Sequence, residues 1–126
     1  MNNPWTLRPA TAQDHLLIAH HRFPDLPLGT RAHQDYAEWI TLAMKQDLYL
    51  GWVAEAQEQV IASVGLVVTA WGTTQGTFQP WQGKIVNVYT LKAWRSHGVT
   101  HHLIEKLLLE AVTLGIHTLD LDAPPL

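Results

Sequence analysis

The sequence predicts an α/β domain whose elements follow the order β-α-α-β-β-β-α-β. Three observations support this class. Short runs rich in β-branched and aromatic residues indicate strands. Two longer segments repeat apolar residues at helical spacing. Between them, residues 48–71 contain two strand-like runs joined by three polar residues, which is a spacing typical of a hairpin.

The N-terminal third is expected to form one strand and two helices. Residues 5–9 are a short strand. Thr11, followed three residues later by Asp14, resembles a capping box that opens the first helix. Residues 23–30 form a loop, because two prolines and a glycine in so short a segment cannot continue a helix. Residues 31–46 then place apolar side chains near one face and predict the second helix.

The rest of the chain is expected to supply the other strands and one long helix. Residues 72–83 are polar and contain glycines, which indicates a loop. The long helix carries an apolar stripe and should end before Gly115. Because no repeat or linker divides the chain, residues 1–126 are predicted to form a single domain. The strands are expected at residues 48–56, 60–71, 84–91 and 116–122, and the helix at residues 98–114.

Composition excludes several classes of function. The chain has no cysteine, which rules out disulfides, thiolate metal sites and a cysteine nucleophile. A net charge of -3 without a basic cluster argues against nucleic-acid binding. No apolar run is long enough to cross a bilayer, and the first residues lack the pattern of a signal peptide. We therefore expect a cytoplasmic protein that does not bind membranes and has a small-molecule partner.

The turn between the fourth strand and the long helix is a candidate anion site. The first amides of a helix have no intrahelical acceptor and carry the positive end of the helix dipole. Gly98 permits close approach of the backbone to a ligand. Arg95 adds a guanidinium that can form bidentate hydrogen bonds with phosphate oxygens. A diphosphate suits this turn.

Residues 95–100 read Arg-Ser-His-Gly-Val-Thr after a hydrophobic strand and before a long helix. This segment resembles the R/Q-x-x-G-x-G/A cofactor motif of the GNAT N-acetyltransferases. Thr100 departs from the motif, because Gly or Ala is expected there. The resemblance implies a mixed, mostly antiparallel sheet flanked by helices. A GNAT domain continues with another helix and two strands, so the resemblance also implies that this chain is short at its C-terminus.

The resemblance implies acetyl-CoA as co-substrate, bound along the fourth strand and the turn that follows it. Pantetheine would pair with the backbone of the strand, and the diphosphate would lie on the turn. The implied contacts are Val88, Tyr89 and Leu91 for pantetheine, and Arg95, Ser96, His97, Gly98, Val99 and Thr100 for the diphosphate.

The implied reaction is direct attack of a primary amine on the thioester in a ternary complex, with a backbone N–H of the fourth strand stabilising the oxyanion. Many relatives carry a carboxylate base on that strand, but here the strand offers Asn87, which cannot act as one. Glu55 is the best remaining carboxylate, and Tyr89 has a place near the thioester. Each also has a purely structural interpretation, as a solvated charge or a packed ring. Outside candidates on the second helix are His33, Asp35 and Glu38.

Two alternatives stay open. His97 and His101 are four residues apart, as metal ligands on a helix can be, but no cysteine or suitably spaced carboxylate accompanies them, and we predict no metal site. The second alternative is a catalytically inactive module that binds CoA or another protein. An unpaired edge on the last strand would favour a homodimer through the open sheet.

Overall fold

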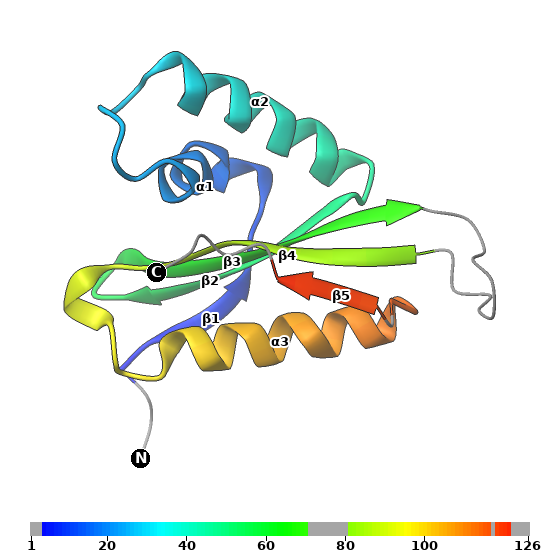
Figure 1. Cartoon of the computed structure of the whole chain (residues 1–126). Helices are drawn as coiled ribbons and strands as arrows, with labels where there is room; N and C mark the ends of the chain where they lie inside the picture. Colours follow the sequence, from blue (N-terminus) through cyan, green and yellow to red (C-terminus); the bar gives the residue numbers. More distant parts are fainter. Residues whose placement is uncertain (1–3, 71–80, 117, 122–126) are drawn as a thin grey trace.

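The structure, a computed structural model, describes residues 4–70, 81–116 and 118–121. These residues form a five-stranded sheet with helices on both faces (Figure 1). The observed order confirms the predicted β-α-α-β-β-β-α-β arrangement. The strands are β1 (Thr6–Pro9), β2 (Tyr49–Ala56), β3 (Gln59–Ala70), β4 (Trp81–Thr90) and β5 (Thr118–Leu121). The helices are α1 (His15–Arg22), α2 (Arg31–Lys45) and α3 (Val99–Thr113), with 3₁₀ turns η1 (Ala12–Asp14) and η2 (Lys92–Trp94).

The sheet is mixed, and its strands lie in sequence order, β1-β2-β3-β4-β5. The first four strands pair antiparallel, whereas β5 runs parallel to β4 after the crossover through α3. β5 pairs only with residues 82–85 of β4. Within the described residues, the edge of β4 opposite β3 therefore has no partner strand over residues 86–90 (Figure 1).

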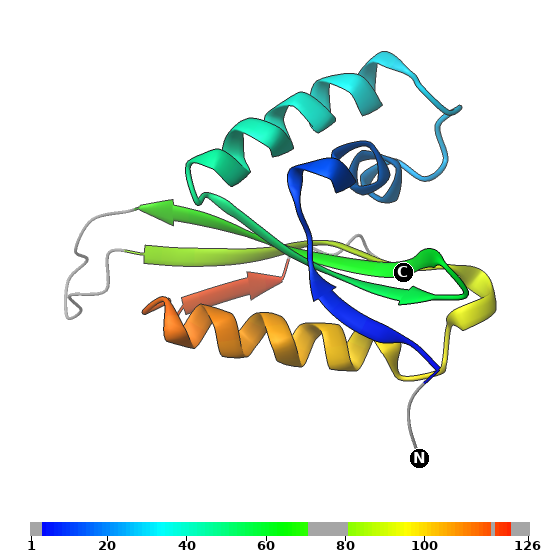
Figure 2. The same ribbon diagram turned by 180° about the vertical axis from the view of Figure 1, so that it is seen from behind.

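Each face of the sheet is covered by its own helical layer. α1 and α2 lie on one face and α3 lies on the other, as both ribbon views show (Figures 1 and 2). Because strand side chains alternate between faces, each face contributes to a separate apolar core. The core under α3 includes Ala54, Ile61, Val64, Leu66, Leu103 and Leu107. The core under α1 and α2 includes Ile18, Ile40, Ala43, Tyr49 and Val86.

Local signals account for the start of the first helical segment. Thr11 and Asp14 form the predicted capping box, with the Thr11 side chain accepting from Gln13 and the Asp14 side chain accepting from the Thr11 amide. The box opens the 3₁₀ turn η1, and α1 follows directly from it. The predicted capping pair is therefore confirmed, one short turn before the α-helix begins.

The expected loop at residues 72–83 is too long, because β4 begins at Trp81. Trp81 pairs with Ala70, and Gly83 pairs with Val68. Pairing with the long strand β3 therefore keeps residues 81–83 in β4, although their own composition favours a turn. Trp81 itself is 43% exposed. Phe78, expected in the same loop, lies outside the described residues.

The β2–β3 hairpin is tighter than predicted. Gln57 and Glu58 alone form its turn, with φ values of 53° and 64°. Positive φ at both central residues is the geometry that matches the right-handed twist of paired strands. In the part of the chain that is described, no helix is both long and apolar enough to span a membrane.

Candidate active site

The segment that follows β4 forms an open turn at the N-terminus of α3. Gly98 precedes the helix with φ 82°, in the left-handed region where glycine carries no steric cost. The first helical hydrogen bond runs from the His102 amide to the Gly98 carbonyl, 3.3 Å. The amides just before His102 therefore lack intrahelical acceptors. No side chain caps this end among the described residues.

A shallow cavity of about 180 Å³ lies at this turn, between the end of β4 and the start of α3. Trp94 lines this cavity, packs against the core and meets Trp5 edge to face with ring centroids 6.4 Å apart. Six residues of this turn are predicted to contact the diphosphate, and five of them line the cavity. The lining residues are Thr90, Trp94, Arg95, Ser96, Gly98, Val99, Thr100 and His101.

Arg95 is exposed, and its Nε donates to the Thr90 carbonyl at 3.1 Å. This bond holds the guanidinium beside the end of β4. The Thr100 hydroxyl is also turned toward the strand, because its Oγ1 lies 2.5 Å from Oγ1 of Thr90. The Val99 side chain is buried in the core under α3, so only the backbone of Val99 faces the turn. His97 is exposed, with its ring 5.6 Å from that of Trp94.

β4 contains a β-bulge near the middle of its unpaired edge. Val86 pairs with Gly65 and Tyr89 pairs with Ser63, so Asn87 and Val88 both lie opposite the single residue Val64. Asn87 has φ 57°, and Val88 is 38% exposed. Further along, Leu91 packs against the core under α3. The bulge thus separates a strand segment paired on both sides from one that is paired on one side only.

A buried polar cluster lies between α1 and this part of the sheet. Nδ1 of His21 is 2.5 Å from the Ser63 hydroxyl, and the His21 ring stacks on Tyr89 with centroids 4.4 Å apart. His21 and Ser63 are 8% and 2% exposed. Burial, helped by the nearby His20, lowers the pKa of His21 to about 4. Tyr89 therefore has a neutral imidazole against its ring at neutral pH.

A second polar group joins the bulge to α2 and β2. Nδ2 of Asn87 donates to the hydroxyls of Tyr36 and Tyr49, at 2.9 and 3.1 Å. Burial raises the pKa of Tyr49, so its hydroxyl keeps its proton. Oδ1 of Asn87 is buried and has no hydrogen-bond partner among the described residues.

Glu55 lies in an ion-pair network on β2, which is separated from β4 by β3. Its carboxylate bonds to Nε of Arg8, and Arg8 also bonds to both oxygens of Asp14 at 2.9 Å. The hydrogen bond from Arg8 lowers the pKa of Asp14, and the two carboxylates raise that of Arg8. Glu55 pairs in register with Thr6 and Val60. The structure therefore places Glu55 with β1 and η1, and its catalytic role stays a prediction.

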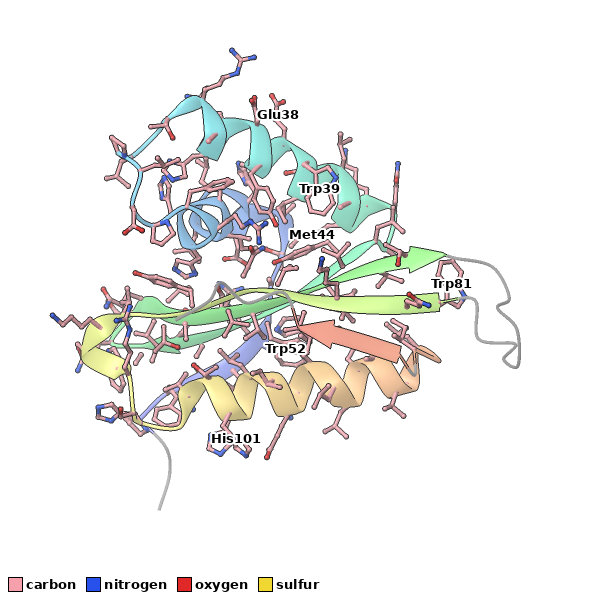
Figure 3. All side chains as sticks on the ribbon, in the orientation of Figure 1. Glu38, Trp39, Met44, Trp52, Trp81 and His101 are labelled. Carbon is pink, nitrogen blue, oxygen red and sulfur yellow. The ribbon has the colours of Figure 1, made fainter. Side chains whose placement is uncertain are left out.

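The three outside candidates are held within the helical layer. His33 is buried and bonds to Thr30 and to the Phe23 carbonyl. Asp35 forms an exposed ion pair with Arg31, and Glu38 points outward from α2 (Figure 3). Among the described residues, no group of three histidines or carboxylates is arranged to hold a metal ion. His101 points away from the sheet and pairs with Glu105 (Figure 3).

Sequence reasoning missed His21, Ser63, Tyr36 and Tyr49. A signal exists for His21, which ends an otherwise apolar helical face. A signal also exists at Asn87, the partner of the two tyrosines, because it interrupts a strand of β-branched and aromatic residues. Their partners come from segments more than 35 residues away, so the contacts depend on the tertiary fold.

Comparison with known proteins identifies the family. The model of the acetyltransferase (GNAT) family matches residues 14–124. A search of curated proteins finds no match. A predicted acetyltransferase of Clostridium acetobutylicum, whose crystal structure contains acetyl-CoA, superposes with a TM-score of 0.84 and 22% identity, over 94% of this chain and 80% of the other.

Two further solved structures are similar. A GCN5-related N-acetyltransferase of Ralstonia eutropha gives a TM-score of 0.80 at 26% identity, over 94% of this chain and 83% of the other. Glucosamine-6-phosphate N-acetyltransferase of Arabidopsis thaliana gives 0.74 at 13% identity, over 97% and 84%. The family match covers most of the sequence, and the observed sheet and helices agree with these folds. This chain belongs to the GNAT acetyltransferase family.

Proposed function

We propose that the protein transfers an acetyl group from acetyl-CoA to a primary amine of a small molecule or peptide. One observation carries this proposal: the edge of β4 over residues 86–90, which has no partner strand among the described residues, leads directly into the open N-terminus of α3. Acetyl-CoA has two parts that suit these features. Its pantetheine amides pair with a strand edge, and its diphosphate binds the free amides of a helix and Arg95.

In this proposal, Val88, Tyr89 and Leu91 lie along pantetheine. Residues 95–100 hold the diphosphate, with Val99 and Gly98 contributing backbone only. Because the Thr100 hydroxyl is turned toward Thr90, its amide rather than its hydroxyl faces the phosphate. Among the described residues that line the turn, Arg95 is the only arginine. Arg95 therefore supplies the positive side-chain charge of the turn.

The chemical step needs few groups. The amine nitrogen attacks the thioester carbon, a C–N bond forms, the C–S bond breaks, and the nitrogen loses one proton while CoA leaves as the thiol. A backbone amide at the β4 bulge stabilises the oxyanion. Tyr89, beside the bulge and against His21, is proposed to line the reacting thioester. Glu55 stays the proposed base, acting from its ion pair with Arg8.

Turnover can be measured without interference from the protein, because the chain has no cysteine and contributes no thiol of its own. We expect release of CoA thiol from acetyl-CoA, detected with a disulfide reagent, when a panel of primary amines is supplied. The same panel without protein is the control. Acetyl-CoA that binds but is not consumed with any amine would support the inactive CoA-binding alternative.

The base is tested by Glu55→Gln. If Glu55 accepts the amine proton, kcat/KM falls about 100-fold or more, and the acidic limb of its pH profile disappears. If the carboxylate only pairs with Arg8, turnover is kept and stability falls by about 1 kcal/mol or less, as for partly exposed ion pairs.

The proposal also covers the oligomeric state and the cellular location of the protein. Within the described residues, β5 forms the last edge of the sheet, and this open edge suits a second copy of the chain. A concentration-dependent mass in light scattering would show such a homodimer. We also propose that the protein is cytoplasmic. Localisation of a tagged full-length chain in cells tests this proposal.

A further inference from the structure

The bulge in β4 is held by a side chain as well as by the strand. Asn87 has φ 57°, a left-handed conformation that residues other than glycine adopt at a cost, with asparagine among the most tolerant. The residue is 6% exposed, and its side chain reaches two other elements. Nδ2 donates to Tyr36 on α2 and Tyr49 on β2. One amide group therefore ties three elements together at the irregular point of the strand.

The sheet itself makes room for this contact. The Tyr49 ring lies over Gly65, where an added Cβ would overlap the tyrosine hydroxyl and ring. At Gly51, the cross-strand partner of Gly65, an added Cβ would lie 3.2 Å from the same ring. Tyr49 is 2% exposed. The paired glycines thus leave space for the Tyr49 ring against the sheet, and the Tyr49 hydroxyl accepts a hydrogen bond from Asn87.

Two features of Asn87, its Oδ1 atom and its left-handed backbone, lower the stability of the fold. Oδ1 of Asn87 is buried and finds no partner in the described part of the chain, which costs on the order of 1–3 kcal/mol. An apolar residue in a regular strand would avoid both this cost and the left-handed backbone. Strained backbone and unsatisfied polar groups that persist in a fold are concentrated at functional sites. Asn87 lies on the β4 segment that has an unpaired edge.

We propose that Asn87 is a positioning residue, which uses the Tyr36 and Tyr49 hydroxyls to fix the β4 bulge so that a backbone amide points at the thioester carbonyl. This inference rests on the proposed function and deepens it. Asn87 does not touch the reacting atoms in this scheme. A bulge leaves one residue out of the ladder, and its amide is then free to serve a ligand. The two tyrosines keep that amide from rotating away.

The experiment uses acetyl-CoA carrying ¹³C at the acetyl carbonyl and measures the infrared stretching band of the bound thioester. A hydrogen bond to the carbonyl lowers the frequency, so the band reports the oxyanion amide without any acceptor amine. The two hydrogen bonds from Asn87 to Tyr36 and Tyr49 are called the clamp below. Asn87→Gly keeps the left-handed backbone and removes the clamp. Gln57→Gly is the matched control, because Gln57 is an exposed residue at φ 53° in the β2–β3 turn. Tyr49→Phe keeps the ring and removes one hydroxyl.

In the native protein and Q57G, we expect the band to shift to lower frequency on binding. In N87G it should return toward its position in free acetyl-CoA, while affinity for acetyl-CoA stays within about threefold. Y49F should give a partial return and should add little to N87G in the double variant, because the clamp acts as one unit. With an active amine, N87G should lower kcat about tenfold or more and leave KM for acetyl-CoA unchanged.

Two results overturn the inference and one overturns its basis. A band in N87G and Y49F at the native position would show that the clamp does not set the amide. Parallel loss of folding and affinity in N87G, with native behaviour in Y49F, would assign Asn87 to stability alone. If the native protein does not bind acetyl-CoA, the proposed function fails before the role of Asn87 arises.

Discussion

The hydroxyls of Thr90 and Thr100 lie 2.5 Å apart and join the last residue of β4 to the first turn of α3. Arg95 adds a second link, from its Nε to the Thr90 carbonyl. Both links converge on Thr90, so the strand end and the turn that follows are held as one unit. Thr100 stands where related motifs have Gly or Ala, and the structure gives its hydroxyl a structural partner.

Thr100→Val tests this assignment. The substitution keeps the size of the side chain and removes the hydroxyl, so the free energy of unfolding should fall by about 1 kcal/mol, the usual net value of one hydrogen bond. Affinity for acetyl-CoA should change less than about threefold, since the hydroxyl does not face the ligand. Urea unfolding and calorimetry measure the two quantities. A tenfold loss of affinity with unchanged stability would place the hydroxyl on the diphosphate instead.

Gly65→Ala should destabilise the protein strongly. The new methyl group would overlap the Tyr49 hydroxyl and ring, and the backbone or the tyrosine must shift. We expect a loss of about 3 kcal/mol, at the upper end of overpacking substitutions. Gly51→Ala is the matched comparison, because its nearest contacts are at 3.0 and 3.2 Å and a small shift relieves them. Equal unfolding midpoints in urea for the two variants would show that Tyr49 is not seated as described.

Stability should fall between pH 7.5 and pH 5 because of His21. The folded state holds the His21 pKa near 4, whereas the ordinary value is 6.5. The unfolded chain therefore binds more protons in this window, and His21 alone should cost about 2 kcal/mol at pH 5. Asp14, whose pKa is lowered from 3.8, loses its stabilising effect only at lower pH.

The measurement is urea unfolding of the native protein and His21→Gln at both pH values. The variant should lose less stability on acidification, by about the His21 contribution. His20→Gln is the control, because the pKa of His20 is lowered in the same direction at a less buried position. Identical losses in the native protein and H21Q would mean that the imidazole is not buried against Tyr89 and Ser63.

Local patterns predicted the elements well where the pattern and the tertiary fold agree. The capping box at Thr11 and Asp14 and the turn at Gly98 before α3 depend on neighbouring residues only, and both are present. The start of β4 was predicted too late, because its first residues include glycine and glutamine. Pairing of Trp81 and Gly83 with β3 outweighs that composition.

The polar clusters could not be predicted, because their partners are distant in sequence. His21 meets Ser63 across 42 residues, and Asn87 meets Tyr36 across 51. From its residue type alone, Asn87 could be interpreted only as a group unable to act as a base. Glu55 was chosen as the best remaining carboxylate without knowledge of its register or its contact with Arg8, and its role as base stays a prediction. Spacing along the chain carries no information about such pairings.

The most direct test is calorimetric titration with acetyl-CoA of the native protein, Arg95→Ala and Arg31→Ala. Arg31 is the matched control, because it is an exposed arginine paired with Asp35 on α2, away from the turn. We predict saturable binding by the native protein and R31A. In R95A the binding free energy should weaken by about 1.5 to 3 kcal/mol, or roughly 10- to 150-fold in affinity. Native affinity in folded R95A, or no binding by the native protein, would contradict a cofactor site at the junction of β4 and α3.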